Sequence, residues 1–134
     1  MYAINKQLRQ YFDGREIAFL SEKLQLLLVN YLEFVCTCTK ETTMVLEELE
    51  INPGSTSDSI VQEITENLSN ITNQDIETSV KTLGYAMSLN RLMGYQIANL
   101  GNIEFLGTES NDLEFAGDLK NKLHLLSTKL FSGV

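Results

Sequence analysis

Two pairs of glutamates have the residue type and spacing that could support chemistry. Glu47 and Glu50 lie three positions apart, and Glu63 and Glu66 repeat that spacing after twelve intervening residues. Side chains three positions apart share a helix face, so two such pairs on facing helices could bind Mg²⁺ through their carboxylate oxygens. A bound Mg²⁺ would stabilise the charge that develops on a phosphate during hydrolysis.

This spacing resembles the motif of the all-α nucleoside triphosphate pyrophosphohydrolases, which pairs Glu-x-x-Glu with a later Glu-x-x-Asp. The resemblance covers about twenty residues and implies an all-α, Mg²⁺-dependent enzyme that hydrolyses nucleotides. The chain departs from the motif at Glu66, where the family has Asp, and it has no match for the family's downstream acidic position. Glutamates at this spacing also occur on solvated helix faces. The enzyme is therefore an alternative hypothesis, and we assign no catalytic residue, metal ligand or cofactor.

The two cysteines form a Cys-x-Cys that could suggest a metal or redox site. Cys36 and Cys38 lie two positions apart, so on a helix they point about 200° away from each other. Ligands of one metal must converge, and only one histidine, His124, is present to help. The spacing therefore excludes a shared site while the helix persists, and we expect Cys38 to pack inside the protein.

The residues around these cysteines predict one long helix over residues 15–49. Apolar side chains recur there at spacings of three and four, which places them within a narrow arc of a helix. They are Ile17, Leu20, Leu24, Leu27, Tyr31, Phe34 and Cys38. Residues 36–43 are rich in cysteine and threonine, which are poorer helix formers, but no glycine or capping box interrupts them. We therefore expect the helix to be continuous.

A second set of residues on this helix points away from that apolar seam. Leu26, Val29 and Cys36 lie outside the arc that the seam occupies. A helix that buries two faces needs neighbours on both sides. These three residues are therefore the candidate interface.

Four further helices are expected, over about 3–12, 59–68, 75–100 and 112–131. Capping boxes are expected at Asp13 with Glu16 and at Ser59 with Gln62. Gly101 is a candidate C-cap and Asn111 a candidate N-cap. No alternating strand pattern occurs. We predict an all-α helical bundle of four to five helices in a single domain, residues 1–134, with residues 15–49 as the long central helix.

The helix expected over 75–100 carries a stripe at heptad-like spacing. The stripe consists of Ile76, Val80, Leu83, Met87, Asn90, Gly94 and Ile97, in which Asn90 is polar. Gly84 and Gly94 each lower helix propensity, so we expect them to mark a close approach between helices or a weak point.

Charge and composition exclude several classes of partner. The 134 residues carry a formal net charge of −8, without a basic cluster, so nucleic acid is a poor partner. The apolar segment that includes residues 24–40 is interrupted by Asn30 and Glu33, so it does not predict a membrane span. The N-terminal residues lack the long apolar region of a signal peptide, so we expect a cytoplasmic setting.

The leading hypothesis is a small acidic protein-interaction module: an adaptor, inhibitor or regulatory protein. It would act through helix-helix packing, as a homo-oligomer (most simply a dimer), with a protein partner, or both, and it needs no cofactor. A third hypothesis is an acidic mimic of nucleic acid that blocks a basic groove of its partner. The acidic residues are scattered along the chain rather than regularly spaced, which argues against this mimicry.

Overall fold

The computed structural model describes residues 2–15, 17–48, 58–106 and 115–133. These residues form five α-helices and a short 3₁₀ helix, and they contain no strand. The α-helices are α1 (Tyr2–Phe12), α2 (Glu22–Glu48), α3 (Ser59–Asn73), α4 (Thr78–Leu106) and α5 (Phe115–Thr128), and the 3₁₀ helix is η3 (Leu130–Gly133). The prediction of an all-α bundle with a long central helix is confirmed, since α2 has 27 residues and α4 has 29.

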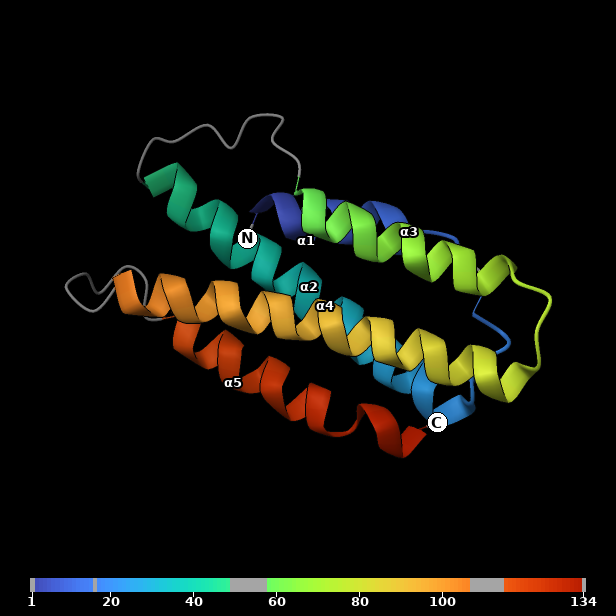
Figure 1. The fold of residues 1–134 in the computed structure, drawn as a ribbon. Coiled ribbons are helices and arrows are strands. Elements are labelled where there is room, and N and C mark those ends of the chain that lie inside the picture. The colour runs from blue at the N-terminus through green and yellow to red at the C-terminus, as the bar shows by residue number, and fades with distance from the viewer. Residues whose placement is uncertain (1, 16, 49–57, 107–114, 134) are drawn as a thin grey trace.

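The five helices form a closed ring around a common core. Following the contacts around the molecule, α1 packs on α3, α3 on α4, α4 on α5, α5 on α2, and α2 back on α1. In Figure 1, α4 runs between α3 and α5 and crosses in front of α2. In such a ring only the inward side of each helix is buried by the other helices.

The core contains the apolar seam that the sequence predicted on the second helix. Six of its seven residues are buried: Leu20, Leu24, Leu27, Tyr31, Phe34 and Cys38. The seventh, Ile17, is partly buried against the same core. Further layers come from the other helices, including Leu8, Ile64, Leu89, Leu92 and Leu123.

The start of the long helix differs from the prediction. α2 begins at Glu22, because the Ser21 hydroxyl accepts a hydrogen bond from the Leu24 amide at 3.2 Å and so caps the helix. The predicted capping box at Asp13 is wrong, because α2 begins nine residues after Asp13, and the second member of the box, Glu16, lies outside the described residues. Asp13 and Gly14 form a turn after α1, and Gly14 adopts a φ of +67°, which favours glycine. The expected continuity is confirmed, since α2 runs unbroken through residues 36–43.

The start of α3 is capped by Asp58, which also joins three helices. Its carboxylate accepts hydrogen bonds from the Ile60 and Val61 amides, at 2.9 and 3.0 Å, and from the Tyr95 hydroxyl of α4, at 2.6 Å. The Gln7 side chain of α1 bonds to the Asp58 backbone in both directions. The expected Ser59 capping box is therefore displaced by one residue, because a carboxylate satisfies two amides at once.

The three later helices also differ from the prediction at their ends. α3 extends to Asn73 rather than ending near Leu68. α4 begins at Thr78 and continues through Gly101 to Leu106, so the proposed C-cap at Gly101 is wrong. α5 packs along this extension, and its Lys120 forms a salt bridge of 2.8 Å with Glu104. Among the described residues α5 covers Phe115–Thr128, so it ends three residues before the expected end, whereas the expected start at residue 112 and the proposed cap Asn111 lie outside the described residues.

None of the described helices is both long enough and apolar enough to span a membrane.

Two aspartate substitutions on α2 are predicted to differ in their effect on stability. Leu27 is 7% exposed, so Leu27→Asp would bury a carboxylate without a partner and lower stability by roughly 3–5 kcal/mol, enough to unfold a marginally stable domain. Val29 is 47% exposed, so Val29→Asp should leave the fold intact. Thermal unfolding followed by circular dichroism measures both. Equal destabilisation by the two variants would contradict this arrangement of α2.

Candidate interaction surface on helix α2

The outward side of α2 carries the three residues that the sequence pointed to as an interface. Leu26 is 63% exposed, Val29 is 47% exposed and Cys36 is also exposed. Spacings of three and seven residues place them on one side of the helix. Glu33, also exposed, lies between them on the same side. We call these four residues the α2 face, and no described segment of the chain buries them.

Open grooves flank the α2 face on both sides. The groove between α1 and α2 has a volume of about 710 Å³ and includes Leu32, Cys36 and Thr39 in its lining. The groove between α2 and α5 has a volume of about 350 Å³ and includes Phe34 and Leu125. A shallow depression over α2 connects the two, since it shares residues with both. The surface is therefore continuous from α1 across α2 to α5.

The charge of these grooves is opposite in sign to that of the whole protein. Four of the six charged residues that line them are cationic. They are Lys6, Arg9 and Asp13 in the α1–α2 groove and Glu33, Lys122 and Lys129 in the α2–α5 groove. The four cations flank apolar side chains and lie in a chain with a net charge of −8. This surface therefore favours an apolar partner segment bordered by acidic residues.

Sequence reasoning did not identify these cations. Lys6 and Arg9 lie on α1, whereas Lys122 lies on α5 and Lys129 directly after it, more than one hundred residues later. They come to one surface only because the ring places α1 and α5 on either side of α2. No local pattern in the sequence contains this information.

The two cysteines occupy opposite environments, as their spacing predicted. Cys36 is exposed on the α2 face, whereas Cys38 is buried in the core, and neither forms a disulfide. His124, the only histidine, lies exposed on α5. The two thiols therefore do not converge on a shared metal or redox site.

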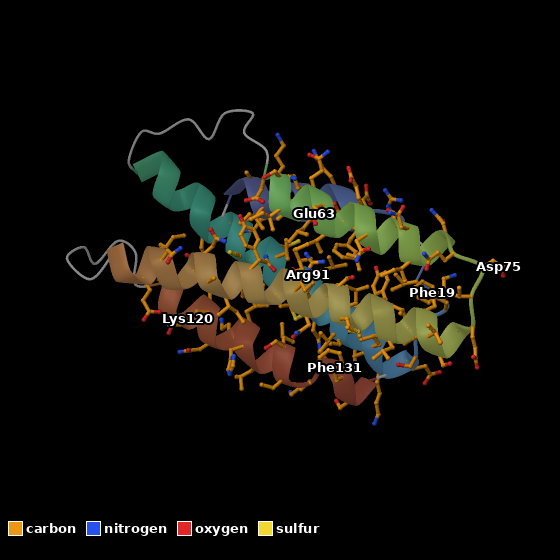
Figure 2. All side chains as sticks on the ribbon, viewed as in Figure 1. Phe19, Glu63, Asp75, Arg91, Lys120 and Phe131 are labelled. Atoms are coloured by element: carbon orange, nitrogen blue, oxygen red, sulfur yellow. The ribbon has the colours of Figure 1, made fainter. Side chains whose placement is uncertain are left out.

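The glutamate pairs of the enzyme hypothesis are only partly described. Glu63 and Glu66 lie on the exposed side of α3, where Figure 2 labels Glu63. The side chain of Glu47 and all of Glu50 lie outside the described part of the structure. Among the side chains that are described, no three His, Cys, Asp or Glu residues are grouped so that they could hold a metal ion. Glu63 and Glu66 thus have no third described ligand near them.

Beneath the α2 face, a buried polar network fixes the position of α2. The Tyr31 hydroxyl donates a hydrogen bond to the Gln96 side-chain oxygen of α4. The Gln96 amide nitrogen in turn donates to the Asn5 side-chain oxygen of α1 at 3.3 Å. All three residues are fully buried. The network therefore connects α2, α4 and α1 through the centre of the ring, where a displaced helix would leave polar groups without partners.

Burial also changes the ionisation of the tyrosines in the core. Desolvation raises the pKa of Tyr31 well above its ordinary value, and the nearby Cys38 raises it further. Desolvation likewise raises the pKa of Tyr85. The folded state therefore holds these phenols in the neutral form at pH values where the unfolded chain ionises them.

Comparison of the chain with protein-family models, with curated proteins and with solved structures gives no match.

Tyr31→Phe is predicted to alter stability in a manner that depends on pH. At neutral pH the variant should be about 1–3 kcal/mol less stable, because the buried Gln96 oxygen loses its donor. Tyrosine ionises near pH 10 in the unfolded chain, so the wild-type protein loses stability as the pH rises from about 10 toward the raised folded pKa of Tyr31. The variant lacks this ionisable group, so its free energy of unfolding should fall less steeply with pH. The difference in slope between the wild-type protein and the variant should reach up to ~1.4 kcal/mol per pH unit. Urea unfolding between pH 7 and pH 11 measures the effect. Parallel stability curves for the two proteins would contradict it.

Proposed function

We propose that this protein is a small helical protein-interaction module: an adaptor, inhibitor or regulatory protein that binds a partner on the α2 face and its flanking grooves. The observation that carries the proposal is the exposed apolar centre of this surface, formed by Leu26 and Val29 on a helix whose opposite side is the core. Grooves on both sides of an apolar helix face can accommodate a partner helix.

The chemistry of the surface defines the partner. Apolar side chains of an amphipathic helix contact Leu26 and Val29, and acidic residues along its edges lie beside the cations of the two grooves. This charge pattern determines the orientation of the partner helix and accelerates its association, while burial of apolar area supplies most of the affinity.

A cytoplasmic setting is part of this proposal. A reducing compartment keeps the exposed Cys36 as a thiol, which leaves the α2 face free of disulfide-linked adducts.

Val29→Asp should abolish partner binding without unfolding the protein. Affinity capture from the native cell, with bound proteins identified by mass spectrometry, compares this variant with the wild-type chain. Ile60→Asp is a matched control, because Ile60 is 46% exposed on α3, close to the 47% of Val29, but lies outside the α2 face. A cross-linker attached to the exposed Cys36 thiol then identifies the bound segment of the partner.

The expected result is one partner, recovered with the wild-type and Ile60→Asp proteins, lost with Val29→Asp, and cross-linked through an amphipathic segment with acidic edges. Recovery that is equal for all three proteins, or no recovery at all, would contradict the proposal.

Charge reversal tests the role of the grooves separately. The double substitution Lys122→Glu and Lys129→Glu reverses the cations of the α2–α5 groove. It should weaken the captured complex, and wild-type binding should also weaken as salt is added, because screening reduces these interactions. Isothermal titration with the partner segment at low and high salt measures both effects. Binding that is insensitive to salt and to the substitutions would show that the cations play no part.

A further inference from the structure

Helix α4 has a second apolar side that faces away from the ring. Its inward side is buried and includes Tyr85, Leu89, Leu92 and Met93. On its outward side Val80, Leu83 and Met87 are 55%, 45% and 55% exposed, and Ile76, two residues before the helix begins, is 44% exposed. These four are the beginning of the heptad-like stripe in the sequence, so the structure places this part of the stripe in solvent, whereas the last residue of the stripe, Ile97, is partly buried against the core.

The outward stripe has the spacing of a two-helix seam. From Val80 its positions alternate by three and four residues through Leu83, Met87, Asn90 and Gly94, so they correspond to the a and d positions of a heptad. Asn90 and Gly94 are also exposed. We call the residues from Ile76 to Gly94 in this stripe the α4 face.

The charges beside the α4 face are complementary to each other. Glu77 and Arg91 are both exposed, and neither has a salt-bridge partner within the described segments. Glu77 directly precedes α4, and its carbonyl accepts a hydrogen bond from the Lys81 amide at 3.0 Å, as expected of the residue that flanks the start of a helix. By sequence spacing both residues directly follow a d position, on the same edge of the stripe, and Figure 2 labels Arg91 on α4.

One arrangement of two copies satisfies these features together. In an antiparallel pair of helices, a positions of one copy lie in layers with d positions of the other. When Met87 shares a layer with Leu83 of the second copy, Val80 shares the next one with Asn90 of the second copy. In this register Glu77 lies beside Arg91 of the second copy, and the two-fold symmetry repeats the ion pair at the other end of the seam.

Gly94 fits the same register. A side chain at this position would meet no atom within 4 Å, so the helix surface there is open. In the antiparallel register the sequence spacing brings Ile76 of the second copy, in the bend two residues before α4, close to this open surface. A large side chain is thus placed against the smallest residue of the stripe.

We propose that the α4 face binds the α4 face of a second copy of this chain, in antiparallel orientation, and forms a symmetric homodimer. This inference does not depend on whether the α2 face binds a partner. The neighbours of α4 in the ring are α3 and α5, whereas those of α2 are α1 and α5, so the two faces lie on different sides of the molecule. Each dimer presents two copies of the α2 face.

A charge swap tests both the interface and its orientation. Glu77→Arg and Arg91→Glu each place like charges together at both ends of the seam, and each should weaken the dimer about tenfold. The double variant carries both substitutions and restores opposite charges in the antiparallel register, so its dimer should regain wild-type affinity. In a parallel pair, residues 77 and 91 are roughly 21 Å apart along the helix axis, too far to form an ion pair, and the double variant would not recover. Sedimentation velocity from about 1 μM to about 500 μM covers the range expected for a short seam.

Leu83→Lys provides a stronger disruption at the centre of the seam. Because Leu83 is 45% exposed, this variant should stay folded, with an unchanged circular dichroism spectrum, while the dimer weakens on the order of a hundredfold. Ile60→Asp is again the control and should dimerise like the wild-type chain.

Several results would overturn the proposal. They are a wild-type protein that stays monomeric over the whole range, a dimer that Leu83→Lys leaves intact, and a double charge variant that is no better than the single variants. Val29→Asp, which tests the proposed function, should leave the dimer unchanged. A failure of one proposal is therefore distinguishable from a failure of the other.

Discussion

The closed ring of five helices limits how much of each helix the protein can bury. Every helix contacts two neighbours around the ring and turns one side toward the core. The apolar residues of α2 and α4 extend beyond that side, to Leu26 and Val29 on α2 and to Val80, Leu83 and Met87 on α4. Exposed apolar surface of this kind is characteristic of interaction sites when it is grouped on one element. The helices carry more apolar surface than the core can bury, and the function that we infer follows from this remaining exposed surface.

Two polar arrangements fix which sides point outward. The buried network of Tyr31, Gln96 and Asn5 determines the rotation of α2 and α4, because a rotated helix would remove a partner from a fully buried group. At the edge of the ring, the Asp58 carboxylate caps α3 and accepts a hydrogen bond from the Tyr95 hydroxyl of α4. With these constraints the inner seam of α2 stays inside and Leu26 and Val29 stay outside.

Much of this organisation could be predicted from the sequence. Spacings of three and four identified the buried seam of α2, and the same geometry separated Cys36 from Cys38. Helix ends were less predictable, because caps depend on competition between adjacent residues. Ser21 caps α2 where Asp13 was expected to, and Asp58 takes the place of Ser59. The extension of α4 through Gly101 follows from packing against α5, which no local pattern contains.

The candidate surfaces, too, could be predicted from the sequence only in part. Three residues of the α2 face, Leu26, Val29 and Cys36, lie close together in the sequence, so helix periodicity found them. The cations that flank them lie on different helices, and only the order of the helices in the ring brings them together. On α4 the periodicity was evident in the sequence, but which side of the helix faces the core depends on how α3 and α5 pack against it. Two apolar stripes on one helix are equivalent until its neighbours are known.

The central claim is that the ring folds on its own and that other chains cover its two outward apolar faces. Methyl NMR spectra of the isolated protein over a series of concentrations test it most directly. The account predicts that the methyl signals of Val80, Leu83 and Met87 shift with concentration, whereas those of Leu26 and Val29 stay constant until a partner is added. Signals from both faces that remain unchanged at every concentration, or core methyl signals such as Leu24 that shift with them, would contradict it.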